Sequence, residues 1–268
     1  MKHTHDAILV VSFGTSAKQT GISAIEQIEA RIRDAFPSYS IYRAWTSDRI
    51  RKKLQEQRQL HICSVTEALE QMKLDGIRNV IIQPTFVIDG EESQRMHEEA
   101  LAYAGDFLSF RFGAPLLSCE TDAKTAATVI SAEAPSHFSY TNDDLVVFMG
   151  HGAAKESSAD SDAMYALVDG FLQQSGHTNM VLRLMNVPGS MDGILELASA
   201  KRPDRIILVP FMIAAGHHAQ KDMAGEQESS WASVLSAAGY SVHCVMNGLG
   251  EYEGIQNLFL DHIRDALQ

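Results

Sequence analysis

Short runs rich in β-branched and other apolar residues alternate with amphipathic helical segments along this chain of 268 residues. The runs predict eight strands, four in each half, at residues 7–12, 40–44, 80–86, 109–112, 145–149, 180–185, 205–211 and 241–245. Such alternation is typical of parallel sheets whose two faces are covered by helices. The sequence therefore predicts the α/β fold class.

The segments between these runs carry the signals of helices. Apolar residues recur at helical spacing in residues 22–36 and again in residues 255–267, so both stripes are expected to face a core. Ser64 and Glu67 have the spacing of a capping box, which predicts the start of a helix. Gly76 is expected to end that helix.

One stretch near the middle of the chain predicts a boundary between two domains. Pro135 and several polar neighbours interrupt both periodicities in residues 132–142, which is typical of a linker. The domains are expected at residues 1–134 and 135–252. Whether the last helix, at residues 253–268, packs back onto the first domain stays open.

The two halves of the chain resemble each other locally. An offset of 138 residues aligns the end of the first run with the end of the fifth and superposes Phe13 on His151. An offset of 126 residues aligns the third run with the seventh and places Glu92 opposite His218. A repeated supersecondary unit explains both matches, and a chance match is the alternative.

The charge of the chain limits its partners. It has 22 Lys and Arg against 34 Asp and Glu residues, a formal net charge of −12. A field of this sign repels nucleic acid and anionic membranes, so neither is an expected partner. An anionic substrate would need a local basic patch, and Arg49, Arg51, Lys52 and Lys53 form the candidate. The alternative for this segment is a solvated helix face.

Three further features predict where the protein works. The apolar stretches fall well short of the roughly 20 residues that a membrane-spanning helix requires. The polar N-terminal residues run directly into a strand-like segment, without the apolar stretch of a secretory signal. Cys63, Cys119 and Cys244 are widely separated, which indicates reduced thiols rather than disulfides or a thiolate metal site. We expect a soluble, cytoplasmic protein.

Histidines follow two of the predicted strands in the second half. His151 lies between two glycines at the end of the fifth run, and His218 follows a glycine and His217 after the seventh. Open parallel sheets bind ligands beyond the carboxyl ends of their strands, where both loops lie. One histidine so placed is about as often a structural hydrogen bonder, but two of them indicate a pair of ligands.

Glu92 adds a carboxylate at the matching position of the first half. Imidazoles combined with a carboxylate suit Co, Ni, Fe and Zn ions and leave coordination positions open, as catalytic sites do. The alternative for Glu92 is a first-turn glutamate that complements a helix dipole. An imidazole with an unperturbed pKa of about 6.5 can also accept a proton. The sequence thus predicts a cleft in which His151, His218 and Glu92 bind a divalent metal and remove protons.

Motifs along nearly the whole chain resemble those of a known family: Leu9-Val10-Val11-Ser12-Phe13-Gly14-Thr15-Ser16, Trp45-Thr46-Ser47, Gly90-Glu91-Glu92, Pro115-Leu116-Leu117, Val147-Phe148-Met149-Gly150-His151-Gly152, Gly216-His217-His218-Ala219, Asp222-Met223-Ala224, Trp231 and Gly248-Leu249-Gly250-Glu251. In this order they resemble the anaerobic-pathway cobalt chelatases of cobalamin biosynthesis, which are class II chelatases. The resemblance implies two similar Rossmann-like, chelatase-like domains, each with a four-stranded parallel sheet flanked by helices. It also implies ATP-independent insertion of Co²⁺ into sirohydrochlorin or a close tetrapyrrole, a lyase reaction.

The resemblance also implies roles for individual residues. His151 and His218 match the metal-binding histidines, His151 also matches the proton acceptor, and Glu92 matches a glutamate of the cleft. The residues expected to bind the tetrapyrrole are Ser12, Phe13, Gly14, Thr15, Met185 and His217. Co²⁺ is expected as a substrate and no cofactor as a permanent component. The tetrapyrrole and the divalent metal are the expected partners, and a homo-oligomer stays open.

The chain departs from the family pattern at two positions. Phe86 stands where the family usually has a histidine, and Met185 stands where it has a metal-binding glutamate. A neutral thioether replaces a hard anionic oxygen poorly on Co²⁺, so the preferred metal could differ, and His217 could compensate. Two alternatives therefore remain: an Fe²⁺ or Ni²⁺ chelatase of the same fold, and a non-catalytic paralogue that binds tetrapyrrole or metal.

Overall fold

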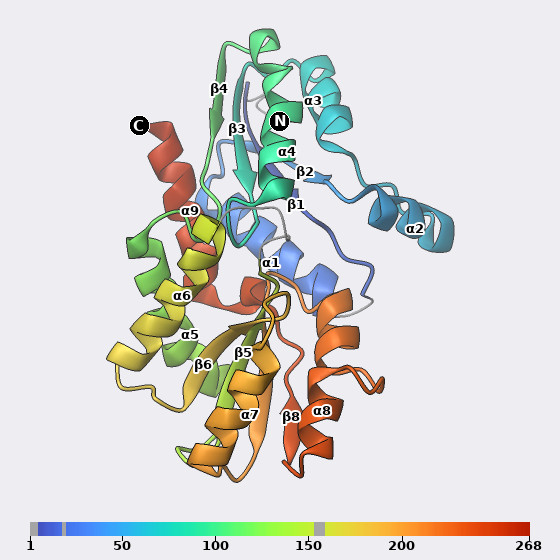
Figure 1. The fold of residues 1–268 in the computed structure, drawn as a ribbon. Coiled ribbons are helices and arrows are strands. Elements are labelled where there is room, and N and C mark those ends of the chain that lie inside the picture. The colour runs from blue at the N-terminus through green and yellow to red at the C-terminus, as the bar shows by residue number, and fades with distance from the viewer. Residues whose placement is uncertain (1–4, 18–19, 153–158) are drawn as a thin grey trace.

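A computed structural model describes residues 5–17, 20–152 and 159–268 of the chain. Two lobes lie one above the other in Figure 1, and each is built on a four-stranded sheet. The upper, N-terminal lobe contains β1 (Asp6–Ser12), α1 (Thr20–Ala35), β2 (Ser40–Trp45), α2 (Asp48–Arg58), α3 (Val65–Leu74), β3 (Asn79–Pro84), α4 (Glu91–Leu101), η1 (Ala104–Asp106) and β4 (Ser109–Phe112).

The lower, C-terminal lobe follows the same plan. It contains α5 (Glu120–His137), β5 (Leu145–Gly150), α6 (Ala159–Gln174), β6 (Met180–Leu184), α7 (Ser190–Lys201), β7 (Ile206–Phe211), η2 (Ala219–Met223), α8 (Trp231–Ala237) and β8 (Val242–Cys244). The chain ends with η3 (Leu249–Glu251) and α9 (Glu253–Leu267). All eight predicted strands are present, and their ends differ from the predicted ones by at most two residues.

The two sheets have the same topology. Their strand orders are β2-β1-β3-β4 and β6-β5-β7-β8, and every recorded pairing is parallel. β1 therefore corresponds to β5 and β3 to β7, as the two local alignments predicted. This arrangement confirms the predicted α/β class with two similar four-stranded parallel sheets flanked by helices.

The central strands form the buried part of each lobe. β1 and β5 are flanked by strands on both sides, and five consecutive β1 residues, Ala7 to Val11, are fully buried. Strands covered by helices on both faces carry continuous apolar runs rather than alternating ones. A single hydrophobic cluster joins the lobes, because it includes Ile8 of β1, Phe148 of β5 and Phe259 of α9.

Helices α5 and α9 connect the two lobes. α5 contacts α6 of the C-terminal lobe, whereas α9 contacts α1, β3 and β4 of the N-terminal lobe. In Figure 1, α9 accordingly runs up beside the first sheet although it is the last element of the chain. The division at residues 134 and 135 stays a prediction, and it falls within α5.

The predicted linker at residues 132–142 is wrong in its first half. α5 continues to His137 and contains Pro135. Proline removes one helical hydrogen bond, but Ala134 is fully buried and Phe138 is 8% exposed, so packing holds the last turn in place. Phe138 also donates its backbone N–H to the Ala134 carbonyl at 3.0 Å. The connection between α5 and β5 therefore begins at Phe138.

Other local expectations are confirmed. The Ser64 hydroxyl accepts from the Glu67 backbone N–H, and the Glu67 carboxylate accepts from the Ser64 backbone N–H, which completes the capping box of α3. Gly76 follows that helix with a φ of +76°. No helix in the described part of the chain is long and apolar enough to cross a membrane. Residues 1–4, used in predicting the location, lie outside the described ranges.

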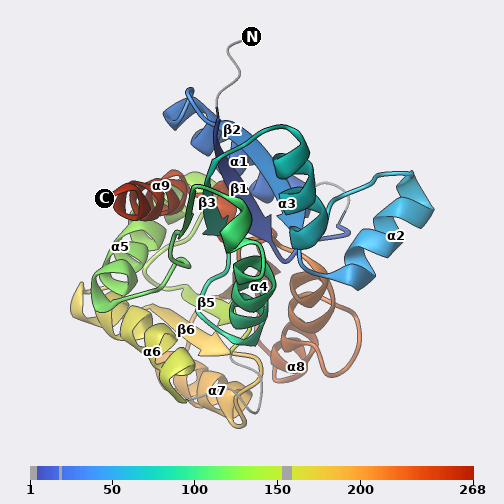
Figure 2. The same cartoon turned by 90° about the horizontal axis from the view of Figure 1, so that it is seen from above.

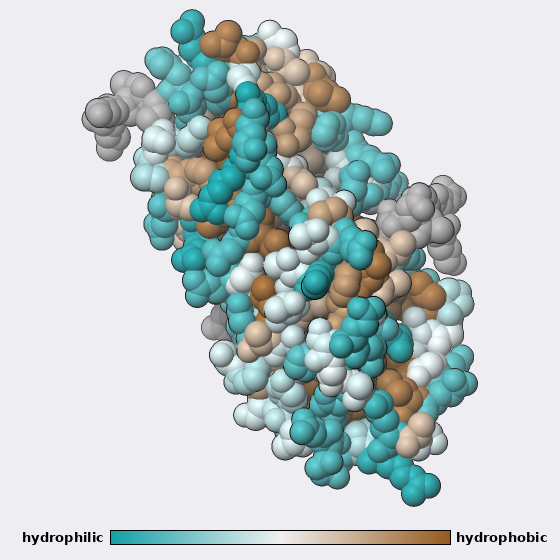
Figure 3. Space-filling model, turned by 90° about the vertical axis from the view of Figure 1, so that its left-hand side faces the viewer, coloured by the Kyte–Doolittle hydropathy of each residue, from teal (hydrophilic) through white to brown (hydrophobic). Residues whose placement is uncertain are grey.

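The outer surface is mixed in character. α2 projects from the N-terminal lobe in both ribbon views (Figures 1 and 2). On the face seen in Figure 3, hydrophobic residues appear in patches between hydrophilic ones. Arg43 and Glu29 form an ion pair, and Glu29 is 4% exposed. The candidate functional site lies at the facing strand ends and not on this outer face.

Candidate functional site

Backbone geometry projects the His151 side chain from the end of β5. An added Cβ on Gly150 would lie 2.7 Å from a Leu184 methyl carbon and 3.2 Å from the Tyr165 ring, so a larger residue would have to displace these side chains. Gly152 has a φ of +80°, a conformation that L side chains rarely adopt. Flanked by these two glycines, His151 leaves the strand at its carboxyl end, where ligands of parallel sheets bind.

The surroundings of His151 favour a neutral imidazole with one nitrogen available. Its Nδ1 lies 2.9 Å from the Gly152 carbonyl oxygen, which can only accept, so the hydrogen is on Nδ1 and the Nε2 lone pair is left for a ligand. Burial lowers the pKa of His151, and the charge of His218 lowers it further. The Gly152 carbonyl and Asp222 act in the opposite direction but do not cancel the effect.

His218 stands next to His151 at the neighbouring strand end. The two ring centroids are 4.7 Å apart and the ring planes are inclined at 73°. His218 Nδ1 lies 2.7 Å from an oxygen of Asp222, one turn further along η2. A carboxylate on Nδ1 fixes the tautomer and leaves Nε2 available, the usual support of a metal-binding histidine. The structure brings together the two histidines predicted to form the ligand pair.

The N-terminal lobe has the same loop backbone after its first strand, with a glycine of positive φ, but a different side chain precedes that glycine. Gly14 has a φ of +93°, and an added Cβ would lie 2.5 Å from the Trp45 ring. Phe13, at the position equivalent to His151, is 49% exposed and presents an aromatic face. Thr15 lies beside Gly216 of the other lobe, because an added Cβ there would be 3.3 Å from the Thr15 hydroxyl. The strand-end loops of the two lobes therefore touch.

Ser12 and Thr15, both predicted to bind the tetrapyrrole, are buried. Ser12 is 2% exposed and its hydroxyl lies 2.7 Å from that of Thr85. Thr15 is 3% exposed, and its hydroxyl accepts from the Ala17 N–H at 3.2 Å. In this conformation both hydroxyls support the loop, and Phe13 is the neighbour with an accessible side chain.

Glu92 lies in the first turn of α4, after the end of β3. One of its carboxylate oxygens accepts from Arg95 Nη2 at 2.6 Å. Within residues 5–17, 20–152 and 159–268, no three His, Cys, Asp or Glu side chains are grouped so as to hold a metal ion. Glu92 is thus paired with Arg95 in this state, and its role as third ligand or proton relay stays a prediction.

The end of β6 presents Asn186, rather than Met185, to His151. Met185 packs against the hydrophobic core of the C-terminal lobe, and its backbone N–H donates to the Gly150 carbonyl. The Asn186 amide nitrogen lies 3.3 Å from His151 Nδ1. Because Nδ1 carries its hydrogen toward the Gly152 carbonyl, both nitrogens are donors and this is a packing contact, not a hydrogen bond. Phe86, the second departure from the family pattern, is 9% exposed within the core of the N-terminal lobe.

His217 and Arg49 lie at the same junction from opposite lobes. The His217 ring centroid is 5.7 Å from that of His218, and the His217 side chain is exposed. Partial burial lowers the pKa of His217, and the charges of His218, Lys221 and Arg49 lower it further, against Asp222. The beginning of α2, which carries Arg49, therefore lies near the histidine loop.

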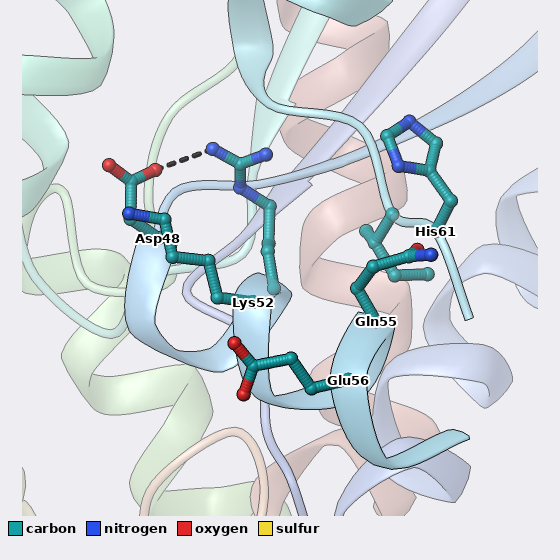
Figure 4. A pocket seen from close by; sticks show the side chains of 7 residues that line it. Asp48, Lys52, Gln55, Glu56 and His61 are labelled. Carbon is teal, nitrogen blue, oxygen red and sulfur yellow. Dashed lines mark hydrogen bonds and ion pairs between the residues drawn. The ribbon is translucent and has the colours of Figure 1, made fainter. Parts of the chain in front are cut away.

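A hollow lies along α2, where Asp48, Lys52, Gln55, Glu56 and His61 surround it (Figure 4). Its lining contains charges of both signs, and an ion pair at its edge ties Asp48 to the helix itself. None of the histidines at the strand ends lines it. The chemistry of the facing strand ends is therefore separate from this hollow.

Sequence reasoning assigned no role to three side chains that hold the site residues: Asp222, Asn186 and Arg95. Asp222 follows His218 by four residues and Arg95 follows Glu92 by three, spacings that bring helical side chains together. That spacing was the available signal for both. Asn186 carried no such signal, because its contact with His151 depends on where β6 ends.

Comparisons with known proteins agree with this geometry. A model of the cobalt chelatase (CbiK) family matches residues 6–268. The chain is 30% identical over 261 residues to the sirohydrochlorin cobaltochelatase of Salmonella typhimurium, covering 97% of this chain and 96% of that protein. It is 30% identical over 266 residues to the sirohydrochlorin cobaltochelatase CbiKC of Nitratidesulfovibrio vulgaris, covering 98% and 91%.

A solved structure supports the fold. SirB from Bacillus subtilis with Fe³⁺ superposes with a TM-score of 0.64 at 16% sequence identity, covering 97% of this chain and 95% of that one. At this identity the likeness concerns the fold alone. The family match, by contrast, extends over nearly the whole sequence, including both histidine loops. The chain belongs to the cobalt chelatase (CbiK) family.

Proposed function

We infer that this protein is a sirohydrochlorin cobaltochelatase, which inserts Co²⁺ into sirohydrochlorin without ATP in cobalamin biosynthesis. Membership of the cobalt chelatase family and the names of two relatives at 30% identity support this activity. The observation that carries the mechanism is the His151–His218 pair, with ring centroids 4.7 Å apart at the ends of adjacent strands. The metal and the tetrapyrrole are both substrates.

The reaction needs ligands for the incoming metal and an acceptor for protons. Metal insertion forms metal–nitrogen bonds to the macrocycle while two pyrrole N–H protons leave and the metal sheds water. In this proposal His151 and His218 hold Co²⁺ through their Nε2 atoms as water leaves. The lowered pKa of His151 keeps its imidazole neutral near pH 7, so that it can bind metal and then accept a proton.

The remaining site residues orient the macrocycle. Phe13 offers an exposed aromatic face to the flat tetrapyrrole from the N-terminal lobe, and His217 faces the same junction from the C-terminal lobe. Glu92 serves as the third ligand or as the acceptor of the second proton. Holding metal, base and macrocycle in one geometry replaces a slow encounter by an intramolecular step.

Two properties of the protein outside the site belong to the same proposal. We place it in the cytoplasm, a location that suits its three unpaired cysteines and its reduced-thiol chemistry. Nucleic acid and membrane surfaces are not proposed as partners, because the net charge of −12 opposes both. Sedimentation measurements would show whether the protein assembles into a homo-oligomer.

Insertion assays with different metals test the function. The purified protein is mixed with sirohydrochlorin and with Co²⁺, Fe²⁺ or Ni²⁺ in turn, and the absorbance change of the macrocycle is followed against a protein-free control. We expect Co²⁺ to be inserted fastest. Equal or faster insertion of Fe²⁺ or Ni²⁺ would reject the cobalt assignment. Tight macrocycle binding without acceleration would reject catalysis in favour of a carrier.

A further inference from the structure

Equivalent residues of the two lobes are contacted by their neighbours at different atoms, with opposite effects on the group that could bind a ligand. Glu92 and His218 occupy matching positions after β3 and β7, and each contacts a charged side chain on the next helical turn. Asp222 contacts His218 at Nδ1, which leaves Nε2 available to a ligand. Arg95 instead contacts the Glu92 carboxylate itself, at 2.6 Å, so one of the two oxygens that would bind metal or accept a proton is engaged.

The exposure and geometry of the Arg95–Glu92 pair allow Arg95 to exchange one carboxylate for another. The Arg95 side chain is 52% exposed and that of Glu92 is 32% exposed, so water and salt weaken the pair. The other contact of Arg95 is long, 3.4 Å from Nη2 to the Thr46 carbonyl oxygen. A guanidinium has five N–H donors and binds carboxylates through two of them at once. Arg95 can therefore receive a second carboxylate.

The substrate supplies such a carboxylate, because sirohydrochlorin carries acidic side chains around its ring. We propose that Arg95 holds Glu92 in the substrate-free protein and exchanges it for a peripheral carboxylate of the tetrapyrrole, which frees Glu92 for the reaction. Arg95 is a positioning residue in this scheme. Binding of the macrocycle and completion of the site thus become one event. This inference rests on the proposed function, since it takes the tetrapyrrole as substrate.

A metal titration tests the first half of the inference. Co²⁺ affinity is measured on the full-length protein without tetrapyrrole, for wild type, Arg95→Met and Arg264→Met. Arg264 forms an exposed pair with Asp261 at the same three-residue spacing and the same 2.6 Å, remote from the site, and is the matched control. We expect Arg95→Met to bind Co²⁺ about twofold to fivefold more tightly, the factor that an exposed ion pair is worth, and Arg264→Met to match wild type.

A second variant identifies the group released. Adding Glu92→Gln to Arg95→Met should remove the gain in Co²⁺ affinity, because the freed carboxylate is then absent. An Arg95→Met protein that binds Co²⁺ as wild type does overturns the inference. So does a gain that persists in the double variant, since it would not come from Glu92.

Steady-state kinetics test the second half. Arg95→Met should raise the KM for sirohydrochlorin about tenfold while kcat changes less, and Arg95→Lys should restore part of the loss because it keeps the charge. An unchanged KM overturns the exchange of carboxylates. Failure of wild type to insert Co²⁺ would instead reject the proposed function, and the titration would still report on the Arg95–Glu92 pair. The two failures are therefore distinguishable.

Discussion

The two lobes share one fold but differ at the ends of equivalent strands. Phe13-Gly14 follows β1 and His151-Gly152 follows β5, and both glycines adopt positive φ angles beside the neighbouring strand. Phe13 is 49% exposed and apolar, whereas His151 is partly buried and hydrogen-bonded. The same loop geometry thus presents an aromatic surface in one lobe and, in the other, the imidazole that we propose as a metal ligand.

A second pair of positions repeats this division. After β7, His218 contacts Asp222 and keeps a free ring nitrogen, while after β3 the equivalent Glu92 is paired with Arg95. In the proposed site, the metal ligands therefore lie mainly in the C-terminal lobe, and the N-terminal lobe contributes an aromatic face and a carboxylate. A duplicated scaffold can specialise in this way because loops at strand ends vary without disturbing the sheet.

Removing the imidazole of the C-terminal lobe should have the largest effect. His151→Ala is expected to lower the insertion rate by about a hundredfold or more, the contribution of a positioned acid–base group, with the fold retained. The assay is initial insertion rate, together with circular dichroism. Phe13→Ala is the comparison from the other lobe and should raise the KM for the tetrapyrrole more than it lowers kcat. Unchanged activity in His151→Ala would remove the distinction between the lobes.

The next effect concerns metal affinity. His218→Ala should weaken Co²⁺ binding, and Asp222→Asn should weaken it by about tenfold or more, because the support of the ring is lost. Calorimetric titration of the metal measures both. If Asp222→Asn binds Co²⁺ as wild type does, the hydrogen bond to Nδ1 does not prepare His218 as a ligand.

The contact of Asn186 with His151 predicts a smaller change. Asn186→Ala removes a side chain that packs against the imidazole, so insertion should slow by about twofold to tenfold, because the ring of His151 becomes less well oriented. The effect should appear in kcat, and Co²⁺ affinity of the free protein should change by the same factor or less. A variant with unaltered kcat would make Asn186 a bystander of the histidine pair.

How far the sequence predicted this site depended on the kind of signal. Glycines flanking His151 and preceding His217 located both loops, because parallel strands end at one edge of a sheet. The α/β class followed from the alternation of strands and helices and was confirmed. Which residues of a motif are accessible to a ligand depends on burial, and the sequence did not predict this. Ser12 belongs to the same motif as Phe13, yet its side chain points into the lobe and bonds to Thr85.

The other errors of prediction arose at the ends of strands and helices, where a shift of one residue changes which side chain faces the site. The predicted sixth strand ran to Met185, but β6 ends at Leu184, and successive side chains of a strand point to opposite faces. Which of Met185 and Asn186 meets His151 therefore depends on one residue of register. Pro135 was expected to open a linker, but buried neighbours on both sides keep it within α5. Tertiary packing is not visible in local patterns.

The last comparison concerns the opposite ends of the same strands. At the start of β1 and β3, Asn79 donates to Asp6 at 2.6 Å, and at the matching ends of β5 and β7, Arg205 donates to Asp144 at 2.9 Å. Asp144 is 3% exposed and also accepts from the Thr141 backbone N–H. The hydrogen bond from Arg205 is the largest cause lowering the pKa of Asp144.

Asp144→Asn should therefore destabilise the protein by about 1 kcal/mol, more than Asp6→Asn, because it replaces a charge-assisted pair at a buried carboxylate. A carboxyl group whose pKa is lowered by folding stabilises the native state above its unfolded pKa of about 3.9, and this stabilisation is lost as pH falls through the lowered value. The difference in free energy of unfolding between wild type and Asp144→Asn, measured by urea at pH 7 and in steps down to pH 3, should begin to shrink as pH falls below about 3.9. Equal losses in Asp6→Asn and Asp144→Asn at pH 7 would mean that the two lobes are stabilised alike at this edge and differ only where the ligands bind.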